Sequence, residues 1–211
     1  GFKPFTYAAA IEYFGKDYKI VTPDISHAKN IHQAAEIIYQ AASQEKSGVF
    51  IGWSLGWLAI LEMLRKFNIK PAGLVSVCST AKFLDDGYLG MGPTKTHLAK
   101  MRRDLARQPQ AVLEDFYTLC GLRQEKIDIK ALLAGLDMLK TCDYRDFIAT
   151  IDIPTLLIAA KKDTICPLQA SVYMHKLIKN SQLKNFDCGH APFLSCAKDF
   201  NETLDNFIKG L

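Results

Sequence analysis

The sequence predicts an α/β fold, in which a mainly parallel sheet is flanked by helices on both faces. Short apolar runs typical of strands lie at residues 18–22, 48–52, 73–78, 155–159 and 183–186. Segments with a helical spacing of apolar residues separate most of these runs, and strands that alternate with helices pair in parallel. Residues 81–150 are the exception, because they show helical patterns only. They therefore predict a helical insertion.

The elements before the insertion follow from the spacing of apolar residues. Residues 31–42 are predicted to be a helix because their apolar side chains recur on one face, at Ile31, Ala34, Ala35, Ile38 and Ala41. The run 48–52 leads into a second helical pattern, formed by Leu58, Ile60, Leu61 and Leu64. The apolar run 73–78 then ends the first half of the sheet.

Three helices are expected in the insertion, over residues 97–107, 111–119 and 129–139. The sheet resumes with strands at 155–159 and 183–186, followed by helices over 167–178 and 197–208. We therefore expect an α/β core made of residues 1–80 and 151–211, and a helical cap, or lid, made of residues 81–150. The cap is expected over the carboxyl edge of the sheet, where open α/β sheets bind ligands.

Composition excludes several classes of protein. The chain has 211 residues, 49% of them hydrophobic and 23% charged, which is enough for one full core. Its apolar stretches fall well short of the roughly 20 residues that span a membrane, and its start shows no signal peptide. We therefore expect a cytoplasmic monomer with no membrane contact. The net charge of +4 is too small and dispersed to predict nucleic-acid binding, and the six cysteines lack metal-site spacing. No metal or cofactor is expected.

The pentapeptide Gly52-Trp53-Ser54-Leu55-Gly56 lies between a strand-like run and a helical pattern. This setting is typical of a nucleophile elbow, a tight turn that exposes a serine hydroxyl above the sheet. We expect both glycines to be needed because a side chain at either would collide with the neighbouring strand or helix. Ser54 is the predicted nucleophile, and the backbone N–H of Leu55 is the predicted oxyanion donor.

A serine nucleophile requires a base and an orienting acid, which follow it in the order Asp, His in this kind of sheet. Asp163 follows the strand-like run 155–159 and His190 follows 183–186, so both are expected at the carboxyl edge of the sheet. We predict His190 as the general base and Asp163 as the orienting carboxylate. Asp187 is the rival acid, disfavoured because it precedes the histidine turn. Taken singly, each residue also fits a structural role. Ser54 could be a surface-loop serine, Asp163 the N-cap of the helix at 167–178, and His190 a polar loop residue.

On these residues the chain resembles the α/β-hydrolase superfamily and, within it, the family of pimeloyl-acyl-carrier-protein methyl ester esterases of biotin synthesis. The elbow is shared by hydrolases in general. Two other segments are more specific, namely Gly-Leu-Asp-Met-Leu-Lys-Thr at 135–141, with Asp143 after it, and His-Ala-Pro-Phe-Leu-Ser at 190–195. The resemblance extends over nearly the whole chain.

The resemblance implies a serine carboxylesterase that hydrolyses the methyl ester of a pimeloyl chain carried by acyl carrier protein. It also implies that Trp53 and Phe116 line the acyl channel. The basic positions that grip the carrier protein in this family do not match, since Asp115 stands where a base is expected. A nearby basic cluster is the candidate docking surface instead, with Lys100, Arg102, Arg103 and Arg107 as its predicted contacts. A solvated helix face explains the same residues.

Two departures from the family pattern matter for the site. Trp57 stands where the family has a second glycine. Family members also have a strand ending in His-Gly upstream, whose loop supplies a second oxyanion donor, and Gly1-Phe2-Lys3-Pro4 resembles the end of that loop. We therefore expect the printed sequence to begin after that strand. The alternatives to the carrier-protein esterase are a generalist short-chain carboxylesterase or thioesterase and a non-catalytic hydrolase-like binding protein.

Overall fold

A parallel sheet forms the centre of the computed structural model, which describes residues 4–42, 47–89, 92–120 and 128–211. In the described residues the sheet has four strands in the order β1-β2-β3-β4. Their bounds are Val49–Trp53 for β1, Gly73–Val77 for β2, Thr155–Ala160 for β3 and Ser181–Phe186 for β4. All three pairings are parallel, so the carboxyl ends of the strands meet at one edge. This confirms the predicted sheet class.

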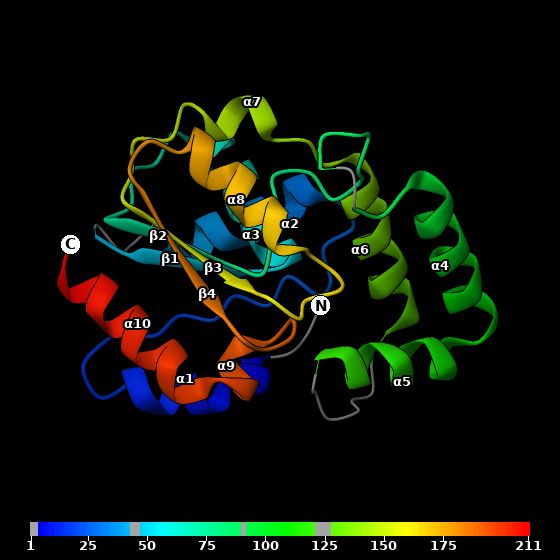
Figure 1. Cartoon of the computed structure of the whole chain (residues 1–211), viewed down its shortest axis with the longest axis horizontal. Helices are drawn as coiled ribbons and strands as arrows, with labels where there is room; N and C mark the ends of the chain where they lie inside the picture. Colours follow the sequence, from blue (N-terminus) through cyan, green and yellow to red (C-terminus); the bar gives the residue numbers. More distant parts are fainter. Residues whose placement is uncertain (1–3, 43–46, 90–91, 121–127) are drawn as a thin grey trace.

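Helices cover both faces of this sheet (Figure 1). One layer holds α2 (Ile31–Ala42), α3 (Leu55–Phe67) and α8 (Leu168–Leu177), and the other holds α1 (Ala8–Phe14), α9 (Pro192–Ser195) and α10 (Ala197–Lys209). Within the first layer, α3 is the helix that follows the Ser54 turn. Its residues 57–64 are buried, with Leu58 and Leu61 at 0% exposure. The second layer packs Phe14 of α1 with Phe200 and Phe207 of α10. The apolar periodicities of 31–42 and 197–208 correctly predicted which faces are buried.

In the described residues, four helices lie between β2 and β3, where the insertion was expected. They are α4 (Lys95–Arg107), α5 (Pro109–Cys120), α6 (Ile129–Thr141) and α7 (Arg145–Ile148). Figure 1 shows α4, α5 and α6 beyond one end of the sheet, beside the helical layers. α4 packs on both α5 and α6. The helical pattern predicted for 81–150 is therefore present in its described part, while the division into core and cap stays a prediction.

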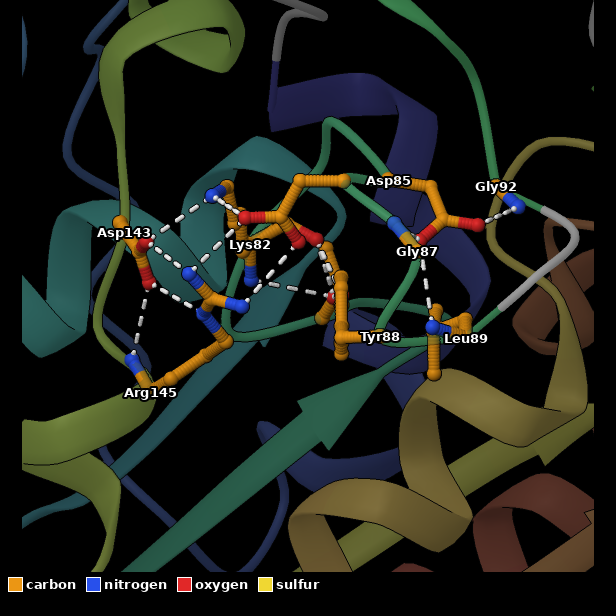
Figure 2. A network of polar contacts seen from close by, with 10 residues as sticks. Lys82, Asp85, Gly87, Tyr88, Leu89, Gly92, Asp143 and Arg145 are labelled. Atoms are coloured by element: carbon orange, nitrogen blue, oxygen red, sulfur yellow. Dashed lines mark hydrogen bonds and ion pairs between the residues drawn. The ribbon is translucent and has the colours of Figure 1, made fainter.

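A cluster of charged side chains joins the two points where the chain enters and leaves this helical segment (Figure 2). Lys82 and Asp143 form an isolated antiparallel bridge, and the Lys82 ammonium lies 3.1 Å from the Asp143 carboxylate and 2.6 Å from Asp86. Arg145 pairs with the same two carboxylates, at 3.1 Å from Asp86 and 2.7 Å from Asp143. Its guanidinium also stacks over the ring of Tyr88. We call these five residues the clasp.

Residues 18–22 do not form the predicted strand. Ile20 and Val21 are 40% and 46% exposed, and in the described residues β2 is the only strand paired with β1. A strand pairs its backbone N–H and C=O groups with a neighbouring strand, and residues 18–22 are not part of the described sheet. Before this segment the chain forms the short 3₁₀-helix η1 (Pro4–Tyr7) and α1, neither of which the apolar pattern predicted. Across the described residues, no helix combines the length and apolar character needed to cross a membrane.

Candidate active site

Ser54 occupies the turn between β1 and α3, as the elbow motif predicts. Its backbone has φ 52° and ψ −123°, a conformation that a non-glycine residue rarely adopts. The turn is held from β2, since the Ser54 N–H donates to the Val77 carbonyl at 3.0 Å and the Ser79 hydroxyl donates to the Ser54 carbonyl at 2.7 Å. Such strain persists only where the surrounding structure over-determines it, most often at functional sites.

The two glycines of the motif differ in what surrounds them. A Cβ on Gly52 would lie 2.5 Å from Trp57 Cα and 2.6 Å from Trp57 N, so a side chain there collides with the start of α3. A Cβ on Gly56 would meet none of the described residues within 4 Å. The expected crowding is therefore confirmed for Gly52 and wrong for Gly56. The ring of Trp57 is fully buried in the apolar cluster to which α2 and α3 contribute.

His190 and Asp163 form a buried hydrogen-bonded pair at the carboxyl edge of the sheet. His190 Nδ1 lies 2.8 Å from Asp163 Oδ2, and both side chains are almost fully buried. Asp163 Oδ1 accepts the backbone N–H groups of Ile165 and Cys166 at 2.8 and 3.0 Å, which fixes the carboxylate. An ionised carboxylate only accepts, so Nδ1 carries the proton and Nε2 is left as an acceptor. Nε2 is buried and has no hydrogen-bond partner among the described residues, so the structure does not hydrogen-bond it to the Ser54 hydroxyl.

Trp53 connects the elbow to the histidine loop. Its indole Nε1 donates to the His190 carbonyl at 2.8 Å, and its ring centroid lies 5.3 Å from the imidazole. The ring is 8% exposed and also contacts Phe193 edge-on. Phe116 of α5 is half-buried and packs against the same apolar cluster. The two predicted channel residues therefore belong to one apolar cluster. Trp53 also hydrogen-bonds to the loop that holds His190.

The rival acid and the other histidines lie elsewhere. The Asp187 side chain is 72% exposed and pairs with Lys162 at 3.2 Å, so the structure favours Asp163 as the partner of His190. His97 caps the start of α4, His32 pairs with the buried Glu62, and His175 contacts Ser181. None of these three histidines contacts Ser54 or Asp163 in the hydrogen bonds described here.

The predicted docking residues lie along α4. Lys100 pairs with Asp104 at 2.5 Å, and Arg103 lies 3.5 Å from the same carboxylate. Arg102 pairs with Asp137 of α6 at 3.0 Å, a partner that sequence spacing did not indicate. All three basic side chains are exposed, as is Arg107 in the last turn of α4. Part of the positive charge of this face is therefore balanced within the protein.

One group of potential metal ligands lies at the site. Cys78, Asp163 and His190 each offer one ligand atom within 4.8 Å of the others. A cysteine binds metal as a thiolate. Burial, and after it the charge of Asp163, raises the pKa of Cys78 well above its ordinary value, so the sulfur keeps its proton. Within this group His190 and Asp163 are hydrogen-bonded to each other, and Cys78 lies beside them. Sequence spacing did not indicate this group, because the three residues come from three different strand ends.

Comparisons with known proteins define the class and then the family. A family model described as the alpha/beta hydrolase fold matches residues 129–195. Among solved structures, an esterase from Exiguobacterium antarcticum superposes with a TM-score of 0.79 at 24% identity, covering 87% of this chain and 75% of that one. A hydrolase from Oleispira antarctica superposes with a TM-score of 0.83 at 14% identity, covering 98% and 86%. The protein therefore has the α/β-hydrolase fold.

Curated relatives narrow this class. The pimeloyl-acyl-carrier-protein methyl ester esterase of Neisseria meningitidis serogroup B is 31% identical over 196 residues, covering 81% of this chain and 72% of the relative. The esterase of the same name from Aromatoleum aromaticum is 29% identical over 185 residues, covering 77% and 74%. The chain belongs to the family of pimeloyl-acyl-carrier-protein methyl ester esterases.

Proposed function

We propose that this protein is a serine esterase that hydrolyses the methyl ester of a pimeloyl chain bound to acyl carrier protein. The observation that carries the catalytic part is the buried His190–Asp163 pair at the same sheet edge as the strained Ser54 turn. The relatives' printed name supports the substrate. The proposal assigns Ser54 as nucleophile, His190 as base and Asp163 as orienting acid.

The chemistry follows from these positions. His190 Nε2 takes the proton of the Ser54 hydroxyl as its oxygen attacks the ester carbonyl, and Asp163 stabilises the imidazolium that forms. The N–H of Leu55, at the first position of α3, has no intrahelical acceptor and so is available to the developing oxyanion. His190 then returns the proton to the departing methanol. Water, deprotonated by the same imidazole, attacks the acyl-enzyme to release the acid and restore Ser54.

Substrate recognition is proposed at two places. Trp53 and Phe116, which share one apolar cluster near His190, would contact the acyl chain. The basic face of α4 would attract the acidic carrier protein, because charge complementarity raises association rates more than it adds affinity. Arg103 and Arg107 carry most of this role, since Lys100 and Arg102 hold closer ion pairs with Asp104 and Asp137, while Arg103 lies 3.5 Å from Asp104.

The test compares pimeloyl-carrier-protein methyl ester with a free short-chain ester, using wild type and Ser54→Ala. We expect hydrolysis that disappears in Ser54→Ala and a kcat/KM that favours the carrier-bound ester. The double variant Arg103→Ala/Arg107→Ala should lower kcat/KM for the carrier-bound ester alone. A matched control is Lys179→Ala, a lysine outside the α4 cluster.

Equal kcat/KM values on both esters would instead support a generalist esterase, which the internally paired charges of α4 favour as second candidate. Hydrolysis that survives in Ser54→Ala would overturn the catalytic assignment. A protein that hydrolyses neither ester, and whose Ser54 is not labelled by a serine-directed phosphonate, would be a hydrolase-like binding protein.

A further inference from the structure

The two residues that flank Ser54 in the chain belong to different apolar clusters. Trp53 shares one cluster with Phe116 of α5. Leu55 packs against another, as does Ala134 of α6. Two helices of the insertion therefore reach the surroundings of the Ser54 turn, α5 through the cluster of Trp53 and α6 through the cluster of Leu55. An ester also has two apolar parts, because its carbonyl carbon carries the acyl chain and its ester oxygen carries the alkyl group of the alcohol.

Gly135 of α6 is in direct contact with the Leu55 side chain. A Cβ on Gly135 would lie 3.6 Å from Leu55 Cδ2, an ordinary contact distance. Beyond α6 itself, that Cβ would meet no other heavy atom of the described residues within 4 Å. Both residues are half-buried, so the space beside them is partly enclosed by protein. An alanine side chain would fit there, and a larger side chain would extend into this space.

The described residues give no packing reason for a glycine at position 135. Glycine is less favourable than alanine inside a helix, and Gly135 lies near the middle of α6. It does not need the left-handed conformation, because Gly87 is the glycine with a positive φ in the described part of the chain. At Gly52, by contrast, a Cβ would collide with the backbone of α3. What the glycine in α6 provides is room beside Leu55.

The room beside Leu55 has an apolar border on α6. Residues three and four positions away from Gly135 share its face of the helix, and all of them are apolar, namely Ala131, Leu132, Met138 and Leu139. The proposed oxyanion donor is the backbone N–H of Leu55, so the carbonyl oxygen of a bound ester lies next to this residue. The group that fits such a space is therefore an alkyl group attached close to that carbonyl.

We propose that Gly135 is a specificity-determining residue, whose missing side chain leaves room beside Leu55 for an alkyl group of the ester. The inference rests on the proposed function and deepens it, because it names the position that limits the size of the substrate. A larger side chain at position 135 would fill the room and exclude long alkyl groups. An ester with short groups on both sides of its carbonyl would still reach Ser54.

The experiment measures kcat/KM for wild type, Gly135→Ala and Gly135→Leu on two series of free esters. The acyl series is methyl acetate, methyl butyrate and methyl hexanoate, and the alcohol series is methyl, butyl and hexyl acetate. We expect Gly135→Leu to hydrolyse methyl acetate at close to the wild-type rate and to lose about tenfold or more on the longest ester of one series. A loss in the acyl series would place the acyl chain beside Leu55, and a loss in the alcohol series would place the alcohol there.

Lys130→Leu is the matched control, because it adds a leucine at an exposed position of the same helix. We expect it to leave the ratio of kcat/KM between long and short esters unchanged. Gly135→Ala provides the measurement should the leucine variant not fold, since its Cβ fits at 3.6 Å from Leu55. It should unfold at a higher urea concentration than wild type and lower the same ratio by about fourfold, the effect of one methylene group.

A ratio that is the same in wild type, Gly135→Ala and Gly135→Leu would overturn the inference, even if all rates fell together, and would leave Gly135 as a packing residue. That outcome is distinct from hydrolysis that survives in Ser54→Ala, which would overturn the proposed function itself.

Discussion

A side chain at Gly52 is expected to displace the nucleophile. The Cβ of alanine would lie 2.5 Å from Trp57 Cα, 2.6 Å from Trp57 N and 2.9 Å from the Gly56 carbonyl carbon. An ordinary carbon contact is about 3.5 Å, so roughly 1 Å of movement is required. All three atoms belong to the backbone of α3, and no side chain can rotate away to make room. The elbow must therefore open, and Ser54 moves with it.

Two magnitudes follow for Gly52→Ala. Overpacking a core typically lowers the free energy of unfolding by about 1–3 kcal/mol. A misplacement of about 1 Å at a reacting group lowers the rate on the order of 100-fold. Urea unfolding measures the first, and hydrolysis of a short-chain ester measures kcat for the second. Both effects should appear in the same variant.

Gly56→Ala is the matched control, because its Cβ would meet none of the described residues within 4 Å. Alanine is favoured over glycine inside a helix by roughly 0.5–1 kcal/mol, so the free energy of unfolding should rise while kcat stays close to wild type. If Gly52→Ala kept wild-type stability and kcat, the collision at Trp57 would not constrain the elbow. Equal losses in both glycine variants would refute the distinction between them.

Three further predictions concern the acid, a buried thiol and the clasp. Asp163→Asn should lower kcat on the order of 10⁴-fold while Asp187→Asn stays near wild type, and the reverse order would transfer the role of the acid. Burial raises the pKa of Cys142 from 9.0 to about 11, so the folded protein holds the thiol proton more tightly than the unfolded chain does. The contribution of this thiol to the free energy of unfolding is therefore full below pH 9 and is lost between about pH 9 and 11. The stability gap between wild type and Cys142→Ala should therefore narrow over that interval, as urea titrations at each pH would report. Arg145→Ala should lower the free energy of unfolding by about 1 kcal/mol, because it removes two ion pairs of the clasp, whereas removing the exposed ion pair of Lys209 should lower it less.

Local sequence patterns predicted most of the regular structure. The Ser54 elbow is a local feature, since an apolar run, a Gly-x-Ser-x-Gly turn and a helical pattern follow one another along the chain. Helices over 31–42 and 197–208 also follow from spacing alone, because burial of one face imposes a period of 3.6 residues. Pattern failed at 18–22, where Ile20 and Val21 have the composition of a strand but no partner in the described residues. A segment forms a strand only when a second segment lies beside it, so strand pairing cannot be predicted from the pattern of one segment alone.

The sequence predicted which residues make up the candidate site, but it did not predict which side chains lie around them. Asp163 and His190 follow strands, and parallel strands bring their ends to one edge, so their meeting was predictable from order along the chain. Nothing in the spacing of Cys78 indicated that its sulfur lies within 4.8 Å of ligand atoms of Asp163 and His190, because that placement depends on β2 lying between β1 and β3. The pairing of Arg102 with Asp137 likewise depends on how α4 packs on α6.

By itself the sequence determined the α/β class, the turn that holds Ser54 and the order in which the acid and histidine follow it, because each depends on neighbours in the chain. Only the tertiary structure decided that His190 hydrogen-bonds to Asp163, that Asp187 lies at the surface, and that Cys78 lies beside the buried pair. Those contacts join residues far apart in sequence. They depend on strand order and burial, which exclude water and make each hydrogen bond at the site stronger than it would be in solvent.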